Sequence, residues 1–319
     1  MKILVTGGSG FIGSNLCREL LRQGNEVVCM DNFMTSHRDN ISDLMLNRNF
    51  EFVYHDVCDP FHVECDQIFH LACPASPLQY TKNPVRTIKT SILGTLNSLE
   101  CARNVNATLL IASTSEIYGD PQVHPQVESY FGNVNTVGDR SCYDESKRAS
   151  ESLAYSWNIQ YNTKVCISRI FNTYGPGMAH NDGRFIPNLI MQALNGKPFT
   201  IYGDGSQTRS WCYVSDTVNG LISLIDNTHH YYEDHKLKVF NIGNPEEKTI
   251  SHTADIIADI LNLEIEKIYL PLPNDDPKQR KPDITLAKNL LFWEPEVSFE
   301  DGMARTIAWF KSRMQEGLI

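Results

Sequence analysis

Residues 2–13 read KILVTGGSGFIG, a β-branched apolar run that passes directly into a glycine-rich turn. Residues 14–23 then place three leucines at helical spacing, and Gly24 stands where a helix C-cap is expected. Residues 25–30 predict a second strand that ends on Asp31. Strand, glycine turn, helix, strand and acid in this order predict a mononucleotide-binding βαβ unit.

Each glycine of the turn has a physical role. Gly7 permits the tight turn after the strand, and Gly10 lets the backbone approach a pyrophosphate closely. Gly13 lets the helix pack against the sheet, with the phosphates at the positive N-terminus of that helix. Asp31 lies where an acid binds the adenosine ribose 2′-hydroxyl, and its charge repels a 2′-phosphate. The sequence therefore predicts NAD rather than NADP as the cofactor.

The composition restricts the kind of protein. A chain of 319 residues with a hydrophobic share of 41% supports a full core. The formal net charge is −10 and no basic run occurs, which argues against nucleic acid as a partner. The nine cysteines lack zinc-site or redox-motif spacing, so we predict reduced core thiols and no metal. The first strand begins at residue 2 and no apolar run approaches about 18 residues, which predicts no signal peptide, no membrane span and a cytoplasmic location.

Strands and helices continue to alternate in the first half of the chain. This alternation predicts an α/β fold of the Rossmann type, a doubly wound parallel sheet with ligands at the carboxyl ends of the strands. Asp56 and Val57 end one of these strands, where an acid can meet the adenine amino group. The predicted strands are 50–55, 66–72, 107–113 and 164–170, and the predicted helices are 85–104 and 144–160.

The pattern and composition of the sequence change from about Asn172. Loops lengthen and Pro, Gly and Asn become dense, which is typical of functional loops. Helical patterns at 250–261 and 301–314, with short strands near Phe240 and Ile268, predict a smaller C-terminal α/β lobe that binds substrate. We therefore predict an NAD-binding domain at 1–171 and a mainly substrate-binding lobe at 172–319, with some segments returning to the first domain.

Candidate catalytic residues follow the strand at 107–113. Tyr143 and Lys147 are four residues apart, so they share one face of the predicted helix. The neighbouring ammonium, helped by a positive nicotinamide ring, is expected to lower the pKa of Tyr143 and make it a base. Thr114 is placed to hydrogen-bond the same substrate hydroxyl. A Tyr-x-x-x-Lys pair alone usually lies on a surface helix and has no catalytic role. Here it accompanies the glycine turn and the polar triplet Thr114-Ser115-Glu116.

Together these features resemble the extended short-chain dehydrogenase/reductases, most of which act on nucleotide sugars. Within them the chain is similar to the UDP-glucuronate decarboxylases (UDP-xylose synthases) over nearly its whole length. The segments that carry this resemblance are His70–Pro77, Ser113–Pro121, Gly132–Asn135, Ser141–Arg148, Arg169–Pro176, Asn181–Arg184, Tyr202–Ser215, Gly243–Glu247 and Arg280–Ile284. Three positions depart from the family pattern: Gly177 replaces a usual Arg, Ala179 follows Met178, and Ser146 replaces a usual Gly.

The resemblance implies roles for individual residues. The expected catalytic residues are Tyr143, Lys147, Thr114, Ser115 as a positioning group, and Glu116 as an acid or base near C5 of the sugar. The expected cofactor-binding residues are Gly7, Gly10, Phe11, Ile12, Gly13, Asp31, Asn32, Asp56, Val57, Ala72, Thr90, Ala112, Tyr143, Lys147 and Thr173. The expected substrate-binding residues are Lys89, Asn97, Asn172, Arg184, Tyr202, Arg209 and Arg280.

The implied reaction begins with oxidation at C4 by NAD and continues with loss of carbon dioxide and return of the hydride, giving UDP-xylose. The resemblance also implies a homodimer through helices at 85–104 and 147–160, although a buried core stripe explains their apolar faces equally well. Other activities remain open. A sugar-nucleotide 4,6-dehydratase, a 4-epimerase or an oxidative decarboxylase that releases the 4-keto pentose shares the first step. A redox-sensing binding protein would have no reason to retain both Tyr143 and Lys147.

Overall fold

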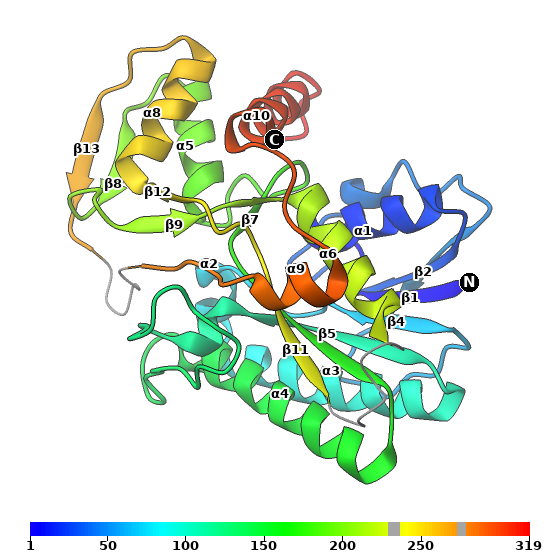
Figure 1. Ribbon diagram of the computed structural model, residues 1–319. Coiled ribbons are helices and arrows are strands. Elements are labelled where there is room, and N and C mark those ends of the chain that lie inside the picture. The colour runs from blue at the N-terminus through cyan, green and yellow to red at the C-terminus, as the bar shows by residue number, and fades with distance from the viewer. Residues whose placement is uncertain (229–236, 273–278) are drawn as a thin grey trace.

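The computed structural model describes residues 1–228, 237–272 and 279–319. Among these residues, seven parallel strands form one sheet with the order β11-β6-β5-β4-β1-β2-β3, the predicted Rossmann-type arrangement (Figure 1). The strands are β1 (Lys2–Thr6), β2 (Glu26–Asp31), β3 (Phe50–Tyr54), β4 (Gln67–His70), β5 (Thr108–Thr114), β6 (Val165–Ile170) and β11 (Lys238–Ile242).

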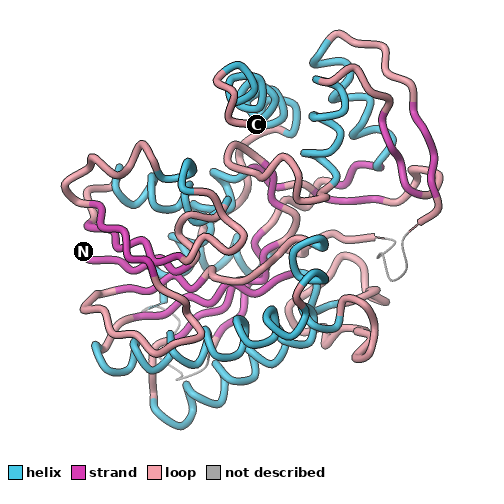
Figure 2. Tube along the Cα trace, turned by 180° about the vertical axis from the view of Figure 1, so that it is seen from behind, coloured by secondary structure: helices cyan, strands magenta, loops and turns pink. Residues whose placement is uncertain are grey.

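Helices cover both faces of this sheet, as in a doubly wound fold (Figures 1 and 2). One face carries α3 (Pro84–Val105) and α4 (Ser141–Tyr161), which pack side by side, with α2 (Pro77–Lys82) next to them. The other face carries α1 (Phe11–Arg22), α6 (Val214–Asp226) and α9 (Thr285–Leu291). Short 3₁₀ turns, η1 (Arg38–Ile41) and η2 (Ser115–Tyr118), follow β2 and β5.

A smaller group of elements lies over the carboxyl ends of the strands. Its helices are α5 (Phe185–Leu194), α8 (Ile250–Leu261) and α10 (Phe299–Gln315). Its strands form three pairs: β7 (Thr173–Tyr174) with β10 (Cys212–Tyr213), β8 (Phe199–Tyr202) with β13 (Lys267–Leu270), and β9 (Thr208–Ser210) with β12 (Glu247–Thr249).

The opening βαβ unit forms as predicted. The helix after the glycine turn begins at Phe11, three residues before the predicted start, because Gly10 already serves as its N-cap. It ends at Arg22, and Gly24 has the positive φ of +84° that favours glycine after a helix. Leu16 and Leu20 are fully buried on the sheet side of α1. The predicted helical spacing therefore matches the face that packs.

One predicted strand lies in a different place from the one expected. The strand near Phe240 was assigned to the smaller lobe, but β11 pairs with β6 along its whole length and belongs to the main sheet. Phe240 is fully buried there, beside α6 and α9. Part of the loop-rich sequence that follows Asn172, at residues 273–278, lies outside the described residues.

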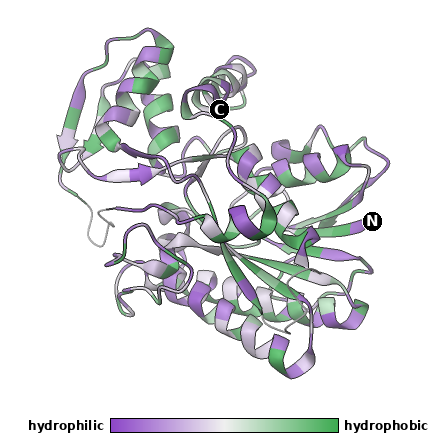
Figure 3. Cartoon of the chain, viewed as in Figure 1, coloured by the Kyte–Doolittle hydropathy of each residue, from purple (hydrophilic) through white to green (hydrophobic). Residues whose placement is uncertain are grey.

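The hydrophobic core joins the two groups of elements. One cluster runs from Val5 and Leu110 in the sheet, through α1 and α6, to Ile190 in α5, Ile257 in α8 and Phe310 in α10. A second cluster lies between the sheet and the α3–α4 layer. Figure 3 shows the hydrophobic residues concentrated along the central strands. None of the helices in the described ranges is long and apolar enough to cross a membrane.

Candidate active site

The carboxyl ends of the parallel strands open into a cavity of about 710 Å³. Its wall includes the glycine turn, the ends of β2, β4, β5 and β6, the start of α4, and loops of the smaller lobe. All the predicted catalytic and cofactor-binding residues line it. A cavity at this edge agrees with the rule that ligands bind at the carboxyl ends of strands in open α/β sheets.

The glycine turn provides a close backbone approach at one end of the cavity. Gly7 has a φ of +70°, and a Cβ there would lie 2.8 Å from the backbone of Ala72. A Cβ on Gly13 would lie 2.2 Å from the carbonyl oxygen of Gly7. No side chain caps α1, whose first turn at Gly10–Gly13 lines the cavity. Uncapped N–H groups at a helix N-terminus suit a diphosphate, so these residues fit a dinucleotide.

Asp31 closes the β2 end of this region. Asp31 is 8% exposed, and its carboxylate accepts hydrogen bonds from the Ser9 N–H, the Phe33 N–H and the Ser36 hydroxyl at 2.8–3.1 Å. These bonds fix the carboxylate in the cavity wall as an ordered anion. A fixed anion here favours a ribose hydroxyl over a 2′-phosphate.

Asp56, expected near adenine, is held by other side chains. The Asn32 amide donates to Asp56 Oδ2 at 3.1 Å, and Arg86 forms an ion pair with the same oxygen. The Cys58 N–H donates to Oδ1 at 2.9 Å. Burial tends to raise the pKa of Asp56, but the Cys58 N–H and Arg86 outweigh it and hold the pKa below its usual value. Asp56 still lines the cavity, as an anion with three protein partners.

The Tyr–Lys pair lies where α4 begins, next to the end of β5. Tyr143 is 6% exposed, and its ring stacks on Tyr80 of α2 with centroids 5.0 Å apart and planes 6° apart. Lys147 Nζ lies 6.0 Å from the centroid of the Tyr143 ring and donates to the Ala112 carbonyl at 2.8 Å. The predicted one-face arrangement of Tyr143 and Lys147 is therefore present, with the lysine held by the sheet.

The expected lowering of the Tyr143 pKa does not occur in the protein alone. Burial raises the pKa of Tyr143, and proximity to Cys73 raises it further, while a hydrogen bond with Thr114 opposes the rise only in part. Lys147 Nζ lies 6.0 Å from the centroid of the Tyr143 ring and donates a hydrogen bond to the Ala112 carbonyl, which limits its effect on the pKa of the phenol. The predicted lowering also requires the positive nicotinamide ring, so it stays a prediction for the protein with bound cofactor.

Glu116 lies at the centre of a buried charge cluster. Both of its oxygens pair with Arg280, and Oε2 also pairs with Arg140. Burial opposes ionisation, but Arg280 and Arg140 more than offset it and lower the pKa of Glu116. Asp144 lies 3.9 Å from Arg140, and burial together with the charge of Glu116 raises its pKa to about 7. Glu116 is thus an anion at neutral pH, which favours the role of base over that of acid.

The predicted substrate residues divide into two groups. Asn172, Arg184, Tyr202, Arg209 and Arg280 line the cavity. Lys89 and Asn97 do not: Lys89 is exposed on α3, and the buried Asn97 amide donates to the Val57 carbonyl at 2.8 Å. Both were placed by resemblance, and the path of α3 beneath the sheet carries them away from the open end.

Several buried polar atoms of the cavity wall have no hydrogen-bond partner in the described part of the chain. They are Ser76 Oγ, Tyr80 Oη, Asn172 Nδ2, Gln207 Oε1, Trp211 Nε1 and Arg313 Nε. Buried donors and acceptors are costly when unpaired, so such a group around one cavity fits a polar ligand. They extend from the Tyr143 region to the smaller lobe, which indicates a ligand longer than one sugar.

Sequence reasoning missed two residues of this site. Tyr80 stacks on the candidate base, and Arg140 pairs with Glu116. Arg140 stands immediately before Ser141-Cys142-Tyr143, so its place at the N-terminus of a catalytic helix was a usable signal. Tyr80 offered none, because its contact with Tyr143 depends on how α2 packs against α4.

Comparison with protein-family models matches residues 4–306 to the family described as GDP-mannose 4,6 dehydratase. Among curated proteins, UDP-glucuronic acid decarboxylase 1 of Arabidopsis thaliana is 48% identical over 98% of this chain and 71% of that protein. The chain belongs to this family of decarboxylases. UDP-glucuronic acid decarboxylase 6 of the same plant is also 48% identical, and the match covers 98% of this chain and 90% of that protein. The family resemblance of the sequence is thereby confirmed.

Solved structures of related enzymes share the fold over almost the whole chain. The UDP-glucuronic acid 4-epimerase from Bacillus cereus, in complex with UDP-glucuronic acid and NAD, has a TM-score of 0.86 and 29% identity, and covers 98% of this chain and 99% of its own. The UDP-N-acetylglucosamine 4-epimerase from Methanobrevibacter ruminantium has a TM-score of 0.89 and 28% identity, covering 98% and 99%. The predicted Rossmann-type α/β class is confirmed.

Proposed function

We propose that this protein is an enzyme that converts UDP-glucuronate to UDP-xylose and carbon dioxide with NAD as cofactor. The observation that carries the proposal is that one cavity joins the dinucleotide turn, Tyr143 and the Glu116–Arg280 cluster. Membership of the decarboxylase family supports the reaction, and the Bacillus cereus epimerase solved with UDP-glucuronic acid and NAD supports the ligand pair.

The first step removes the proton of the sugar 4-hydroxyl. Tyr143 is the base, since it is buried at the cavity wall and Tyr80 fixes its ring. A bound NAD would supply a hydride acceptor for C4 and the donor for its return, and the positive nicotinamide ring would favour ionisation of a nearby phenol. Thr114, hydrogen-bonded with Tyr143, orients the same hydroxyl. The positive charge of the nicotinamide ring would offset the raised pKa that Tyr143 has in the protein alone.

The second step breaks the bond between C5 and the carboxylate. The 4-ketone is β to that carboxylate, so the electron pair left by carbon dioxide is delocalised into the carbonyl as an enolate. Arg140 and Arg280 supply positive charge to this region, and Glu116 holds both guanidinium groups in place. Because Glu116 is ionised, we assign the proton that C5 takes up to water. Hydride return to C4 then completes the sequence, with one proton consumed and no net redox change.

The rest of the substrate is assigned to the smaller lobe. Arg184 and Arg209 line the cavity there and suit a diphosphate, and Asn172 offers a buried amide without a partner in the described residues. We therefore propose that residues 1–171 mainly bind NAD and residues 172–319 mainly bind the UDP-sugar. In the second part, α6, β11 and α9 return to the dinucleotide sheet.

Product analysis tests this function. With UDP-glucuronate in large excess over NAD, we expect carbon dioxide release and UDP-xylose far beyond one equivalent of NAD. A 4-keto pentose and free NADH in amounts equal to the NAD supplied would instead identify an oxidative decarboxylase. A 4-epimerised acid without carbon dioxide would identify an epimerase, and turnover of another nucleotide sugar by loss of water would identify a dehydratase.

We also propose a homodimer that forms through α3 and α4. Val85, Ile88, Tyr155 and Ile159 are 39–65% exposed on these helices, and an exposed apolar surface of this kind often marks an interface. The alternative of a buried core stripe fits less well, because α3 buries mainly small and polar residues. Ile159→Glu should shift the mass measured by sedimentation from dimer to monomer, whereas Leu46→Glu, on another exposed surface, should not. A monomeric wild-type protein at assay concentration would disprove the proposal.

All nine cysteines are free thiols, which supports a reducing compartment such as the cytoplasm.

A further inference from the structure

Asp144 is a buried carboxyl group that the proposed reaction does not use. It follows Tyr143 at the start of α4, and the N–H groups of Tyr143 and Asp144 both donate to the Arg140 carbonyl, at 3.0 and 3.1 Å. Asp144 is 6% exposed and is not among the described residues that line the cavity. It can therefore act on a bound ligand only through a neighbouring group.

The carboxyl group of Asp144 lacks the hydrogen bonds that a buried negative charge needs. Its Oδ1 is buried without a hydrogen-bond partner in the described residues. Its Oδ2 lies 3.9 Å from Arg140 Nε, beyond hydrogen-bond distance, while Nη2 of Arg140 pairs with Glu116. An ionised carboxylate without hydrogen bonds is costly inside a protein, so this geometry favours the protonated, neutral form.

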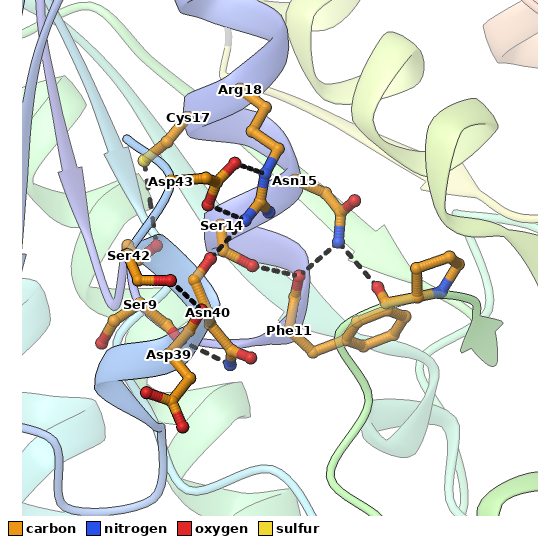
Figure 4. Close-up of polar contacts among 12 residues, drawn as sticks. Ser9, Phe11, Ser14, Asn15, Cys17, Arg18, Asp39, Asn40, Ser42 and Asp43 are labelled. Carbon is orange, nitrogen blue, oxygen red and sulfur yellow. Dashed lines mark hydrogen bonds and ion pairs between the residues drawn. The ribbon is translucent and has the colours of Figure 1, made fainter. Parts of the chain in front are cut away.

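A surface carboxylate of the same chain has the opposite arrangement. Arg18 donates to Asp43 Oδ2 and Oδ1 at 2.8 and 2.6 Å, so both oxygens are paired (Figure 4). These bonds hold the pKa of Asp43 below its usual value. Asp144 has no such pair, and burial together with the charge of Glu116 raises its pKa to about 7. Below neutral pH, Asp43 is therefore charged and Asp144 is not.

The proton on Asp144 decides the net charge of three residues that line the cavity, Glu116, Arg140 and Arg280, which form the Glu116 cluster. One anion pairs with two cations in this cluster, so one positive charge is in excess while Asp144 is neutral. Ionisation of Asp144 cancels that excess.

The other titratable neighbours of Asp144 in the described part of the chain do not alter this count. Burial raises the pKa of the Tyr80 phenol and of the Cys142 thiol, so both are neutral at pH 7. Glu145 lies 3.6 Å from Arg148 at the surface, and these two charges balance.

The Glu116 cluster lies beside the proposed site of oxidation. The Thr114 hydroxyl, hydrogen-bonded with Tyr143, accepts from the Glu116 N–H at 3.2 Å. In a glucuronate ring the carbon that carries the carboxylate, C5, is bonded to C4, whose hydroxyl is assigned to Tyr143. A bound acid sugar therefore brings its negative charge to the cluster.

We propose that Asp144 determines specificity for an acid sugar, because its bound proton leaves the Glu116 cluster with one positive charge that the substrate carboxylate neutralises. A nucleotide sugar with a hydroxymethyl group at C5 gains nothing from that charge. Preference for the acid sugar is lost as pH rises and Asp144 ionises. This inference rests on the binding of UDP-glucuronate in the proposed function, and not on its decarboxylation.

Titrations of the full-length protein with bound NADH measure this preference without turnover, since NADH cannot oxidise the sugar. The measured quantity is the dissociation constant of UDP-glucose divided by that of UDP-glucuronate, in which effects of pH on the shared UDP group cancel. At pH 8.5, about 1.5 pH units above the pKa of Asp144, roughly 3% of the molecules keep the proton. We therefore expect the ratio to fall roughly tenfold between about pH 6 and pH 8.5.

Two matched variants isolate the titrating group. Asp144→Asn keeps the group neutral at every pH, so at pH 8.5 it should bind UDP-glucuronate roughly tenfold more tightly than wild type, with a ratio that does not depend on pH. Asp43→Asn changes a paired surface carboxylate and should keep the wild-type ratio and pH profile. Calorimetry of the wild type in two buffers of different ionisation enthalpy should show proton uptake with UDP-glucuronate and none with UDP-glucose.

A wild-type ratio that does not change with pH, or binding of UDP-glucuronate without proton uptake, would overturn the assignment even if Asp144→Asn does not fold. A ratio that falls equally in Asp144→Asn would also overturn it, because another group, such as His180 of the cavity wall, would then titrate. Failure of the proposed function is a separate result: UDP-glucuronate would bind with the expected pH profile, but no carbon dioxide would form.

Discussion

Removing the carboxylate of Glu116 perturbs the charge cluster at its centre. Glu116→Gln deprives Arg140 and Arg280 of their shared anion, and their side chains are only 18% and 5% exposed. Loss of one partner from a buried ion pair costs about 3–5 kcal/mol. The pKa of Glu116, about 2 against its ordinary 4.5, implies about 3 kcal/mol at neutral pH. We therefore expect the free energy of unfolding to fall by about 3 kcal/mol.

Urea unfolding at a series of pH values measures this loss. A lowered folded-state pKa means that the ionised carboxylate stabilises the protein above the unfolded pKa of about 4.5, and that this contribution disappears as pH falls toward about 2. The gap between wild type and Glu116→Gln should accordingly be largest near pH 7 and shrink below about pH 4.5. Arg140→Gln should cost less than Glu116→Gln, because Glu116 keeps Arg280.

A surface pair provides the matched control. Glu19→Gln removes the partner of Arg22, which is 74% exposed, and should cost less than about 1 kcal/mol. If Glu116→Gln costs no more than Glu19→Gln, or if its cost does not depend on pH, the carboxylate does not hold the cluster together. The account of Glu116 as an ionised group that holds the Arg140 and Arg280 guanidinium groups in place would then be wrong.

Other predictions concern the reaction and the cofactor. Tyr143→Phe should lower turnover by about 10²-fold or more while NADH affinity stays near wild type, and near-normal turnover would remove Tyr143 as the base. Tyr80→Leu should lower turnover by roughly tenfold and leave NADH binding intact, since it frees the Tyr143 ring to tilt; an unchanged rate would show that the stack is dispensable. Asp31→Asn should weaken NAD and narrow its preference over NADP, as measured by titration with each cofactor; an unchanged ratio would show that Asp31 does not face the ribose.

Local patterns were enough to predict the opening βαβ unit. The turn at Gly7–Gly13, its helix and Asp31 are adjacent in the chain, so spacing and glycine chemistry determine their arrangement. Tyr143 and Lys147 were predictable for the same reason, because four residues make one helical turn. The burial of the Tyr143 phenol was not predictable, since it depends on packing between distant segments, such as the stack on Tyr80, which the spacing does not encode.

The contacts between distant segments were the least predictable part. Arg280 reaches Glu116 across more than half of the chain, and only resemblance suggested that both belong to one site. Lys89 was predicted by resemblance alone and lies outside the cavity. The placement of Phe240 in the main sheet depends on which strand edge is left open, and periodicity carries no information about that.

The return of β11 to the main sheet affects how the chain can be divided. Between Ile170 and Lys238 the polypeptide builds part of the smaller lobe, and only then does it supply the strand that covers β6. A fragment that stops at residue 171 would expose β6 as an unpaired edge with buried-type residues such as Val165 and Ile167. Such edges recruit other chains, so the fragment should aggregate. On the ribosome, the nascent sheet likewise stays incomplete until β11 emerges, and a chaperone that shields β6 would protect the chain during that interval.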